Sequence, residues 1–256
     1  MPPDCRVALD GSILVAIQGV VSLDTPPRVL TVSRLCRHPA LLFVNWLFIW
    51  LCISCEAQAA PQEDWLIVPG VRVGPITAGT APTDLVEMFG EANVQPGEIQ
   101  QQEGPPRIGT VVYPDEPARR LEIIWQELED RRTPWRIFIR GDSSAWTTQG
   151  GVTLGTTLKE LEQVNGGVFG LAGFMWDYSG TVMSWEGGSL ASAFTRGDPS
   201  GNWDANQRII LSLQPTIPTR PDDVFLAVIG DRRFLSSHSS MQLLNPRVQE
   251  IVVSFD

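Results

Sequence analysis

The stretch Gly150–Gly188 holds the densest set of helix and turn signals in the chain, and it limits what the rest can form. Thr157 is followed three residues later by Glu160, the pattern of a capping box at a helix start. Apolar residues then recur at helical spacing until Gly166, which suits the left-handed conformation of a helix C-terminus. Residues 181–186 alternate between two faces as a strand does. The stretch predicts a short helix, a glycine-rich loop and a strand.

The opening of this stretch has a counterpart 76 positions earlier, because Ile76–Thr80 corresponds to Val152–Thr156. The correspondence continues through the helix that follows, where Leu85 matches Leu161 and Gly90 matches Gly166. Later segments match at shifts of 71 and 72, as loop-length changes would produce: Gly109–Val111 with Gly180–Val182, and Arg136–Ile137 with Arg208–Ile209. The pattern predicts two repeats, each a short helix followed by antiparallel strands.

The predicted class is α+β, with each short helix packed on the apolar face of an antiparallel sheet. In the first repeat Thr80 is expected to cap a helix that has Pro82 in its first turn. Along 120–126, apolar Leu121, Ile123 and Trp125 share one strand face. A helix is expected at 222–229, and strands are expected at 109–113, 120–126, 135–140, 181–185, 191–195, 208–213 and 248–255.

The first 59 residues are predicted to be an N-terminal extension plus a signal peptide. Arg34, Arg37 and His38 precede an uncharged apolar run over 40–54, and Ala57–Ala59 supplies an A-x-A cleavage pattern. Fifteen residues are short for a spanning helix, which needs about 20. Two alternatives stay open: an uncleaved anchor at 40–54, or a lipoprotein attached at Cys55. The protein is therefore expected to be exported, to the periplasm or the medium.

Composition excludes several kinds of site in the chain after residue 59, the part that is expected to be exported. All four cysteines lie before residue 60, so neither a disulfide nor a cysteine metal site is expected there. His238 is the only histidine that remains, and no metal and no cofactor are predicted. The net charge of −10 argues against a nucleic-acid partner. Membrane contact is expected only through the N-terminal apolar run, if it is not cleaved.

Tandem units of this length resemble the β-lactamase-inhibitor-like fold and the related small outer-membrane assembly lipoproteins. The features that carry the resemblance are a Gly-Thr or Gly-Met step into a short helix, a Leu/Phe-Gly pair at the helix end and antiparallel strands after it. It covers Val73–Asp256 and departs in the second repeat, whose helix ends Val164-Asn-Gly166. The run Gly150–Gly188 also resembles a segment of exported bacterial proteins. The first resemblance implies a two-layer module for protein–protein contact in the envelope, with no catalytic residue to transfer.

Aromatic and acidic side chains after the second helix are the candidate site. Asp177 and Glu186 flank the Gly180 turn and are a candidate carboxylate pair for glycoside chemistry. The structural alternative is that Asp177 caps a turn and Glu186 ends a strand in solvent. Trp125, Trp135 and Trp185 are expected to face inward, whereas Trp146 and Trp203 are expected in exposed loops. The candidate binding residues are Phe169, Phe174, Trp176, Tyr178, Trp146 and Trp203.

Other motifs favour structural roles. His238 lies in Ser236–Ser240, but a nucleophile adjacent to its base is not how catalytic triads are built, and no G-x-S-x-G elbow is present. A polar loop is the simpler interpretation. The glycine pairs do not precede a Lys-Ser/Thr step, so they do not predict a phosphate loop.

The predicted organisation is an extension with signal peptide at 1–59, a linker at 60–72, repeat one at 73–145 and repeat two at 146–256. The expected function is that of an exported, non-enzymatic binding protein of the bacterial envelope that contacts another protein or a peptide. The alternative is a secreted carbohydrate-binding protein or carboxylate-dependent hydrolase that uses Asp177 and Glu186. The segment Gly167–Tyr178 has no good counterpart in repeat one, and any function specific to repeat two is expected there.

Overall fold

The computed structural model describes residues 64–102, 104–128, 131–197, 203, 205–216 and 222–255. The chain divides into two units, 1–58 and 59–256, and all described residues belong to the second. The predicted signal peptide, its apolar run at 40–54 and Cys55 lie outside the described residues. Among the described helices, none has the length and apolar character needed to cross a bilayer.

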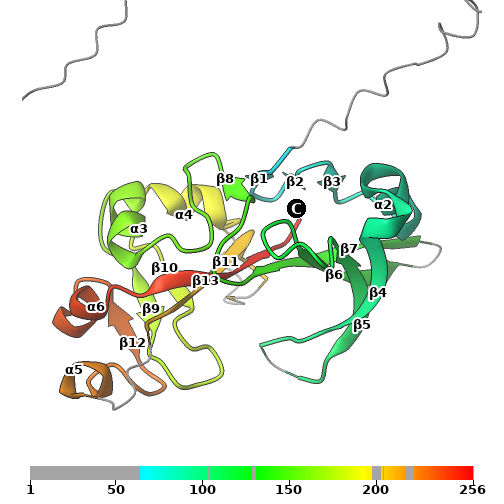
Figure 1. Cartoon of the computed structure of the whole chain (residues 1–256). Coiled ribbons are helices and arrows are strands. Elements are labelled where there is room, and N and C mark those ends of the chain that lie inside the picture. The colour runs from blue at the N-terminus through cyan, green and yellow to red at the C-terminus, as the bar shows by residue number, and fades with distance from the viewer. Residues whose placement is uncertain are drawn as a thin grey trace, which may run out of the picture. The chain divides into compact units, whose positions relative to one another are not determined.

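A six-stranded antiparallel sheet is the centre of the folded unit (Figure 1). Its order is β11-β13-β7-β6-β5-β4, so β7 from the first half of the chain pairs with β13 at the chain's end through Ile137–Arg140 and Glu250–Val253. Strands from both predicted repeats therefore share one sheet. Its members are β4 (Val94–Ile99), β5 (Arg107–Val112), β6 (Leu121–Leu128), β7 (Arg131–Arg140), β11 (Ile209–Gln214) and β13 (Arg247–Val253).

Two smaller sheets flank the large one. The first has the order β3-β2-β1-β8, in which β1 and β8 are parallel, and the second has the order β10-β9-β12. Since β1 and β2 pair within it, the folded part of the chain begins inside the predicted linker 60–72. The strands are β1 (Leu66–Val68), β2 (Arg72–Val73), β3 (Ile76–Thr77), β8 (Thr147–Thr148), β9 (Gly170–Ala172), β10 (Val182–Ser184) and β12 (Arg233–Leu235).

The helices are short. They are α2 (Pro82–Phe89), α3 (Leu158–Asn165), α4 (Ser189–Phe194), α5 (Asp223–Leu226) and α6 (Ser239–Leu244), with a 3-10 turn η1 (Glu91–Asn93) after α2. Antiparallel sheets with short helices confirm the α+β class.

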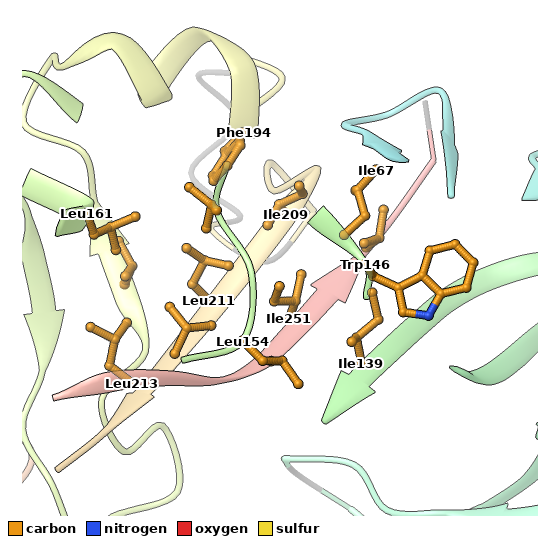
Figure 2. Close-up of a cluster of buried hydrophobic side chains, with 14 of the residues drawn as sticks. Ile67, Ile139, Trp146, Leu154, Leu161, Phe194, Ile209, Leu211, Leu213 and Ile251 are labelled. Atoms are coloured by element: carbon orange, nitrogen blue, oxygen red, sulfur yellow. The ribbon is translucent and has the colours of Figure 1, made fainter. Parts of the chain in front are cut away.

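The main hydrophobic core lies between the large sheet and the helices (Figure 2). Ile209, Leu211 and Leu213 of β11 point into it beside Ile251 of β13, and Leu161 of α3 packs over them. The predicted alternation of β6 is confirmed, because Leu121, Ile123 and Trp125 all belong to this core. At about 25 cal/mol per Å² of apolar surface removed from water, such a core is the main stabilising contribution to the fold.

The opposite face of the sheet also buries side chains, which the expectation of a single apolar face did not include. Five of them form a second cluster, and an ion-pair network borders it. Arg140 donates to Glu122 at 2.6 Å, pairs with Glu250, and lies over the Phe138 ring at 4.3 Å. The cluster consists of Ile99, Ile124, Phe138, Ile210 and Val252.

The two helix starts related by 76 positions use the same hydrogen bonds. The backbone N–H groups of Thr77 and Thr153 donate to the hydroxyls of Thr80 and Thr156, at 3.0 Å in both cases. A carboxylate at the third helical position then accepts the N–H of the cap residue, at 2.8 Å in both: Asp84 from Ala81, and Glu160 from Thr157.

Thr157 is confirmed as the cap of α3, since its hydroxyl accepts the N–H of Glu160 at 3.2 Å. The prediction that Thr80 caps α2 is wrong, because the cap position is Ala81. Thr80 instead closes the preceding turn, a local bond that a threonine makes as readily as a cap.

The strand predicted at 191–195 is wrong, because this segment lies in α4 and the residue after it. Leu190 and Phe194 are the buried residues, and their spacing of four is helical. Asn165 accepts the N–H of Leu190 at 3.2 Å, so a side chain from α3 supplies a bond that α4's own sequence lacks.

The helix predicted at 222–229 is only the single turn α5, capped by Asp222, whose carboxylate accepts the N–H of Phe225 at 2.9 Å. Ser236–Ser240, predicted as a polar loop, contains the start of α6. Strand β4 was not predicted, since Pro96 and Gly97 are unusual within strands. Pro96 is tolerated because β4 is the edge strand of the sheet.

Candidate functional site

Three of the six predicted binding residues are part of the core. Phe169 and Trp146 are fully buried and Phe174 nearly so, which leaves them no surface for a partner. The prediction that Trp146 is exposed is wrong. Its indole N–H donates to the Arg119 carbonyl at 2.9 Å, and its ring meets the Trp65 ring edge-on at 4.8 Å. The polar residues around Trp146 in the sequence do not reveal this burial, because the partners come from other parts of the chain.

Trp176 and Tyr178 are exposed, as a binding role requires. They lie on the segment between β9 and β10, together with Met175, and the exposed fractions are 62% for Met175, 56% for Trp176 and 37% for Tyr178. Large apolar side chains that stay this exposed in one short segment are a common mark of a contact surface. This segment lies at the end of Gly167–Tyr178, where the sequence predicted a function specific to the second half.

The segment is held by its own backbone and by the chain near α5. Phe174 donates its N–H to the Val228 carbonyl at 2.9 Å and accepts the N–H of Gly230 at 3.1 Å, while its ring stacks on Phe225. The Ser179 hydroxyl accepts the N–H of Met175 at 3.1 Å. These bonds present Trp176 and Tyr178 on an ordered turn, which lowers the entropy that a partner must remove on binding.

A hollow of about 270 Å³ lies beside the two rings. Trp176 lines the hollow next to Gly230. A Cβ atom added to Gly230 would lie 3.8 Å from the indole nitrogen of Trp176. Two carboxylates, Asp177 and Asp231, share the hollow with the rings. We refer to it as the Trp176 pocket; it is lined by Ala172, Gly173, Trp176, Asp177, Tyr178, Gly230 and Asp231.

The proposed carboxylate pair is not assembled in this pocket. Asp177 lines it, whereas Glu186 forms an ion pair with Arg233 and is absent from the lining. Asp231 takes the place beside Asp177, and no sequence pattern links these two residues, which lie on different turns. The spacing of residues in the sequence therefore could not predict that Asp231 and Asp177 line the same pocket.

Trp203 is half-buried and connects the pocket to the second face of the sheet. Its ring meets Tyr178 edge-on at 6.4 Å, its N–H donates to the Met183 carbonyl at 3.0 Å, and it packs against the second cluster. The Trp203 ring therefore packs against Tyr178, and its indole N–H is already hydrogen-bonded within the protein.

His238 has a structural role. Its Nδ1 accepts the N–H of Ser240 at 3.2 Å, which caps α6, and its ring packs edge-on against Phe234. Ser236 donates its hydroxyl to Glu162 and accepts the N–H of Phe169 at 3.0 Å. The serines around His238 therefore serve backbone and helix packing.

Trp135 was predicted to face inward. It is instead half-buried on β7 and lines two hollows at the protein surface. Trp125 and Trp185 are buried in the core as predicted. The difference arises at a bulge in β7: Ile124 and Trp125 of β6 pair with Arg136 and Pro134, which leaves Trp135 as the extra, unpaired residue. A bulge shifts the alternation by one residue, which a simple two-residue period does not reveal.

Asp64 and Glu160, two carboxylates whose pKa is lowered, lie outside the Trp176 pocket. The backbone N–H of Leu66, helped by Arg72, lowers the pKa of Asp64, and the backbone and hydroxyl of Thr157 lower the pKa of Glu160. Both carboxylates stabilise turns. Within the described part of the chain, no group of three or more His, Cys, Asp or Glu side chains is placed to hold a metal ion.

No family model matches this chain, and no curated protein or solved structure matches it either. Function must therefore be inferred from the site itself.

Proposed function

We propose that this chain is an exported, non-enzymatic binding protein of the bacterial envelope, and that it holds a protein or peptide partner at the Trp176 pocket. The observation that carries the proposal is an exposed tryptophan and an exposed tyrosine around a hollow that also contains two carboxylates. Aromatic faces and carboxylates both attract cations. The side chain that suits this pocket best is a lysine or arginine of the partner.

The volume and charge of the pocket agree with that occupant. About 270 Å³ admits one long side chain rather than a folded domain, and the protein's net charge of −10 attracts a basic segment from a distance. Interface residues of this kind, tryptophan and tyrosine above all, contribute most of the binding free energy in protein complexes.

The hydrolase alternative has less support. Retaining glycoside hydrolases need two carboxyl groups on either side of one bond, and one of them must stay protonated in a site shielded from water. Asp177 and Asp231 are both exposed, and Glu186 is paired with Arg233. Carbohydrate binding without hydrolysis remains a chemistry that Trp176 and Tyr178 would suit, so it enters the test as a separate outcome.

The test is binding of a fluorescent lysine- and arginine-rich peptide to the full chain, measured by anisotropy. Trp176→Ala and the double change Asp177→Asn with Asp231→Asn should each weaken binding by about tenfold or more. Leu243→Ala is the control, because Leu243 is 72% exposed on α6 and does not line the pocket.

Four outcomes would count against the proposal. The peptide could fail to bind, or bind equally to all variants. Oligosaccharides could bind instead, in a Trp176-dependent manner, which would favour the carbohydrate alternative. Release of a product from a chromogenic glycoside, lost in Asp177→Asn, would contradict the non-enzymatic function.

We also propose that residues 73–145 and 146–256 are two copies of one ancestral unit, related to the β-lactamase-inhibitor-like modules. The identical hydrogen bonds at the starts of α2 and α3 support this origin. Export by a signal within 1–59 is part of the same proposal, with a membrane anchor at 40–54 or lipidation at Cys55 as alternatives. N-terminal sequencing and mass determination of the protein from each cell fraction would separate the three.

A further inference from the structure

A second surface lies where β5 and β6 separate. The two strands pair only through Thr110–Val112 and Leu121–Ile123, although β6 continues to Leu128 alongside β7 and β5 continues to Arg107 alongside β4. The separation begins after the pair Thr110–Ile123, next to the bulge that Trp135 forms in β7. Beyond it, in the described part of the chain, the outer edge of β6 has no neighbouring strand.

The separation creates a hollow of about 590 Å³, which we call the β5–β6 opening. Ile108 stands at its rim and is 70% exposed. A second hollow of about 410 Å³ shares Gln126 and Trp135 with it. The lining of the opening is Arg107, Ile108, Trp125, Gln126, Glu127, Arg132 and Trp135.

Positive charge collects at this place in an otherwise acidic protein. The guanidinium groups of Arg107 and Arg136 lie over the Trp135 ring, at 5.1 and 4.6 Å from its centre. Arg132 lies across the opening, 3.6 Å from Glu127, and both of these side chains are largely in solvent. An exposed pair of this kind contributes little to stability and is readily exchanged for another carboxylate.

The backbone of β6 adds a second means of recognition. Residues 125–127 use one edge to pair with β7, and their other edge borders the opening. An unpaired strand edge is a template for an added strand, in which backbone hydrogen bonds supply affinity and alternate side chains supply specificity.

We propose that the β5–β6 opening binds an extended acidic segment of a partner protein. The segment pairs with the edge of β6, its carboxylates meet Arg107 and Arg132, and an apolar residue between them rests on Ile108 and Trp135. This surface is separate from the Trp176 pocket, and the proposal does not depend on the function assigned to that pocket. A single-stranded nucleic acid also favours arginine beside tryptophan, but it has no peptide backbone to pair with the edge of β6, whereas an acidic polypeptide uses both features.

The test uses the full chain and a short fluorescent peptide in which glutamate alternates with valine. Its matched control is the same peptide with glutamine in place of glutamate. We expect the acidic peptide to bind, the glutamine peptide to bind at least about tenfold more weakly, and added salt to weaken the acidic complex.

Variants then locate the site. Arg107→Glu combined with Arg132→Glu should reduce acidic-peptide binding by about tenfold or more. Arg232→Glu makes the same kind of charge change at an exposed arginine beside Phe234, outside the opening, and should leave binding unchanged. Trp176→Ala should also have no effect, which keeps failure at the Trp176 pocket distinct from failure here. If the double variant does not fold, Arg107→Gln with Arg132→Gln replaces it.

Hydrogen exchange tests the strand addition itself. The amides within 125–127 that point away from β7 should exchange more slowly when the acidic peptide is bound. The proposal is overturned if the acidic peptide does not bind, if the charge-reversed variant binds it as wild type does, if those amides are unaffected, or if an oligonucleotide binds more tightly at the same salt concentration.

Discussion

Helices α2 and α3 begin with the same hydrogen bonds and end in different surroundings. Each follows a threonine-closed turn and has a carboxylate that accepts the N–H of its cap residue. Only α3 also has a capping hydroxyl, because Thr157 stands where α2 has Ala81. The shared bonds are local, within eight residues, and they specify where a helix starts. They do not specify what the helix packs against.

The difference is greatest at the C-terminal ends. Asn165, the last residue of α3, is buried, donates to the carbonyls of Gly167, Val168 and Trp185, and accepts the N–H of Leu190. Its counterpart Phe89 is half-buried and meets Tyr113 edge-on. After α2 the chain passes through η1 straight into β4, whereas after α3 it enters β9 and the turn of the Trp176 pocket. The polar end of α3 therefore anchors the segment that has no counterpart.

The largest expected effect tests whether α2 and α3 contribute equally to the stability of the hydrophobic core. Leu85 and Leu161 are both fully buried, so Leu85→Ala and Leu161→Ala should each lower the free energy of unfolding by about 2–5 kcal/mol. Urea unfolding followed by circular dichroism measures both. A loss below about 1 kcal/mol for one of them would show that its helix is not a full part of the core.

A smaller loss, about 2 kcal/mol, is expected for Asn165→Ala, because buried carbonyls and the Leu190 N–H lose their partner. The change should also loosen the Trp176 segment and weaken peptide binding there. Phe89→Ala is the matched change in α2, and it should lower stability without altering the pocket. Equal effects of the two variants on peptide binding would contradict the anchoring role of Asn165.

The side chain at the cap position should stabilise α3 by about 1 kcal/mol more than it stabilises α2. Thr157→Ala removes the hydroxyl that caps α3 and should lower the free energy of unfolding by about that amount. Ala81→Ser supplies the missing hydroxyl to α2 at an extended cap position and should raise it by about 0.5–1 kcal/mol. Thermal unfolding of both variants is the measurement, and a neutral or destabilising Ala81→Ser would mean that this position cannot act as a cap.

The smallest effect concerns pH. Hydrogen bonds from Thr157 lower the pKa of Glu160 in the folded state, so its contribution to stability is complete above the higher pKa that it has in the unfolded chain. That contribution is lost as pH falls through the lower, folded pKa. Because Glu160 is exposed, its size should stay below about 1 kcal/mol. The free energy of unfolding of the wild type should fall more steeply with acid than that of Glu160→Gln. Parallel curves for the two proteins would exclude the effect.

The sequence predicted local features well. The start and end of α3, the α+β class and the alternation of β6 all depend on residues close together in the chain, and all are confirmed. Errors occurred where a distant partner decides the outcome. The α4 segment was read as a strand, yet it is a helix whose first turn bonds to Asn165.

The candidate site follows the same rule. Of the predicted binding residues, Trp176 and Tyr178 are exposed, whereas Trp146, Phe169 and Phe174 are buried by elements far away in the sequence. Nothing in the spacing of residues indicated that Asp231 would join Asp177, or that Arg107 and Arg136 would meet at Trp135.

The sequence by itself determined where short helices begin and which strands have an apolar face, because capping bonds and side-chain alternation act within a few residues. Only the tertiary structure decided that both halves share one sheet, that the end of α3 is a polar anchor and that two strands separate next to a bulge. Those outcomes depend on contacts between residues tens of positions apart, where the burial of the whole core selects one arrangement over others that the local signals allow equally.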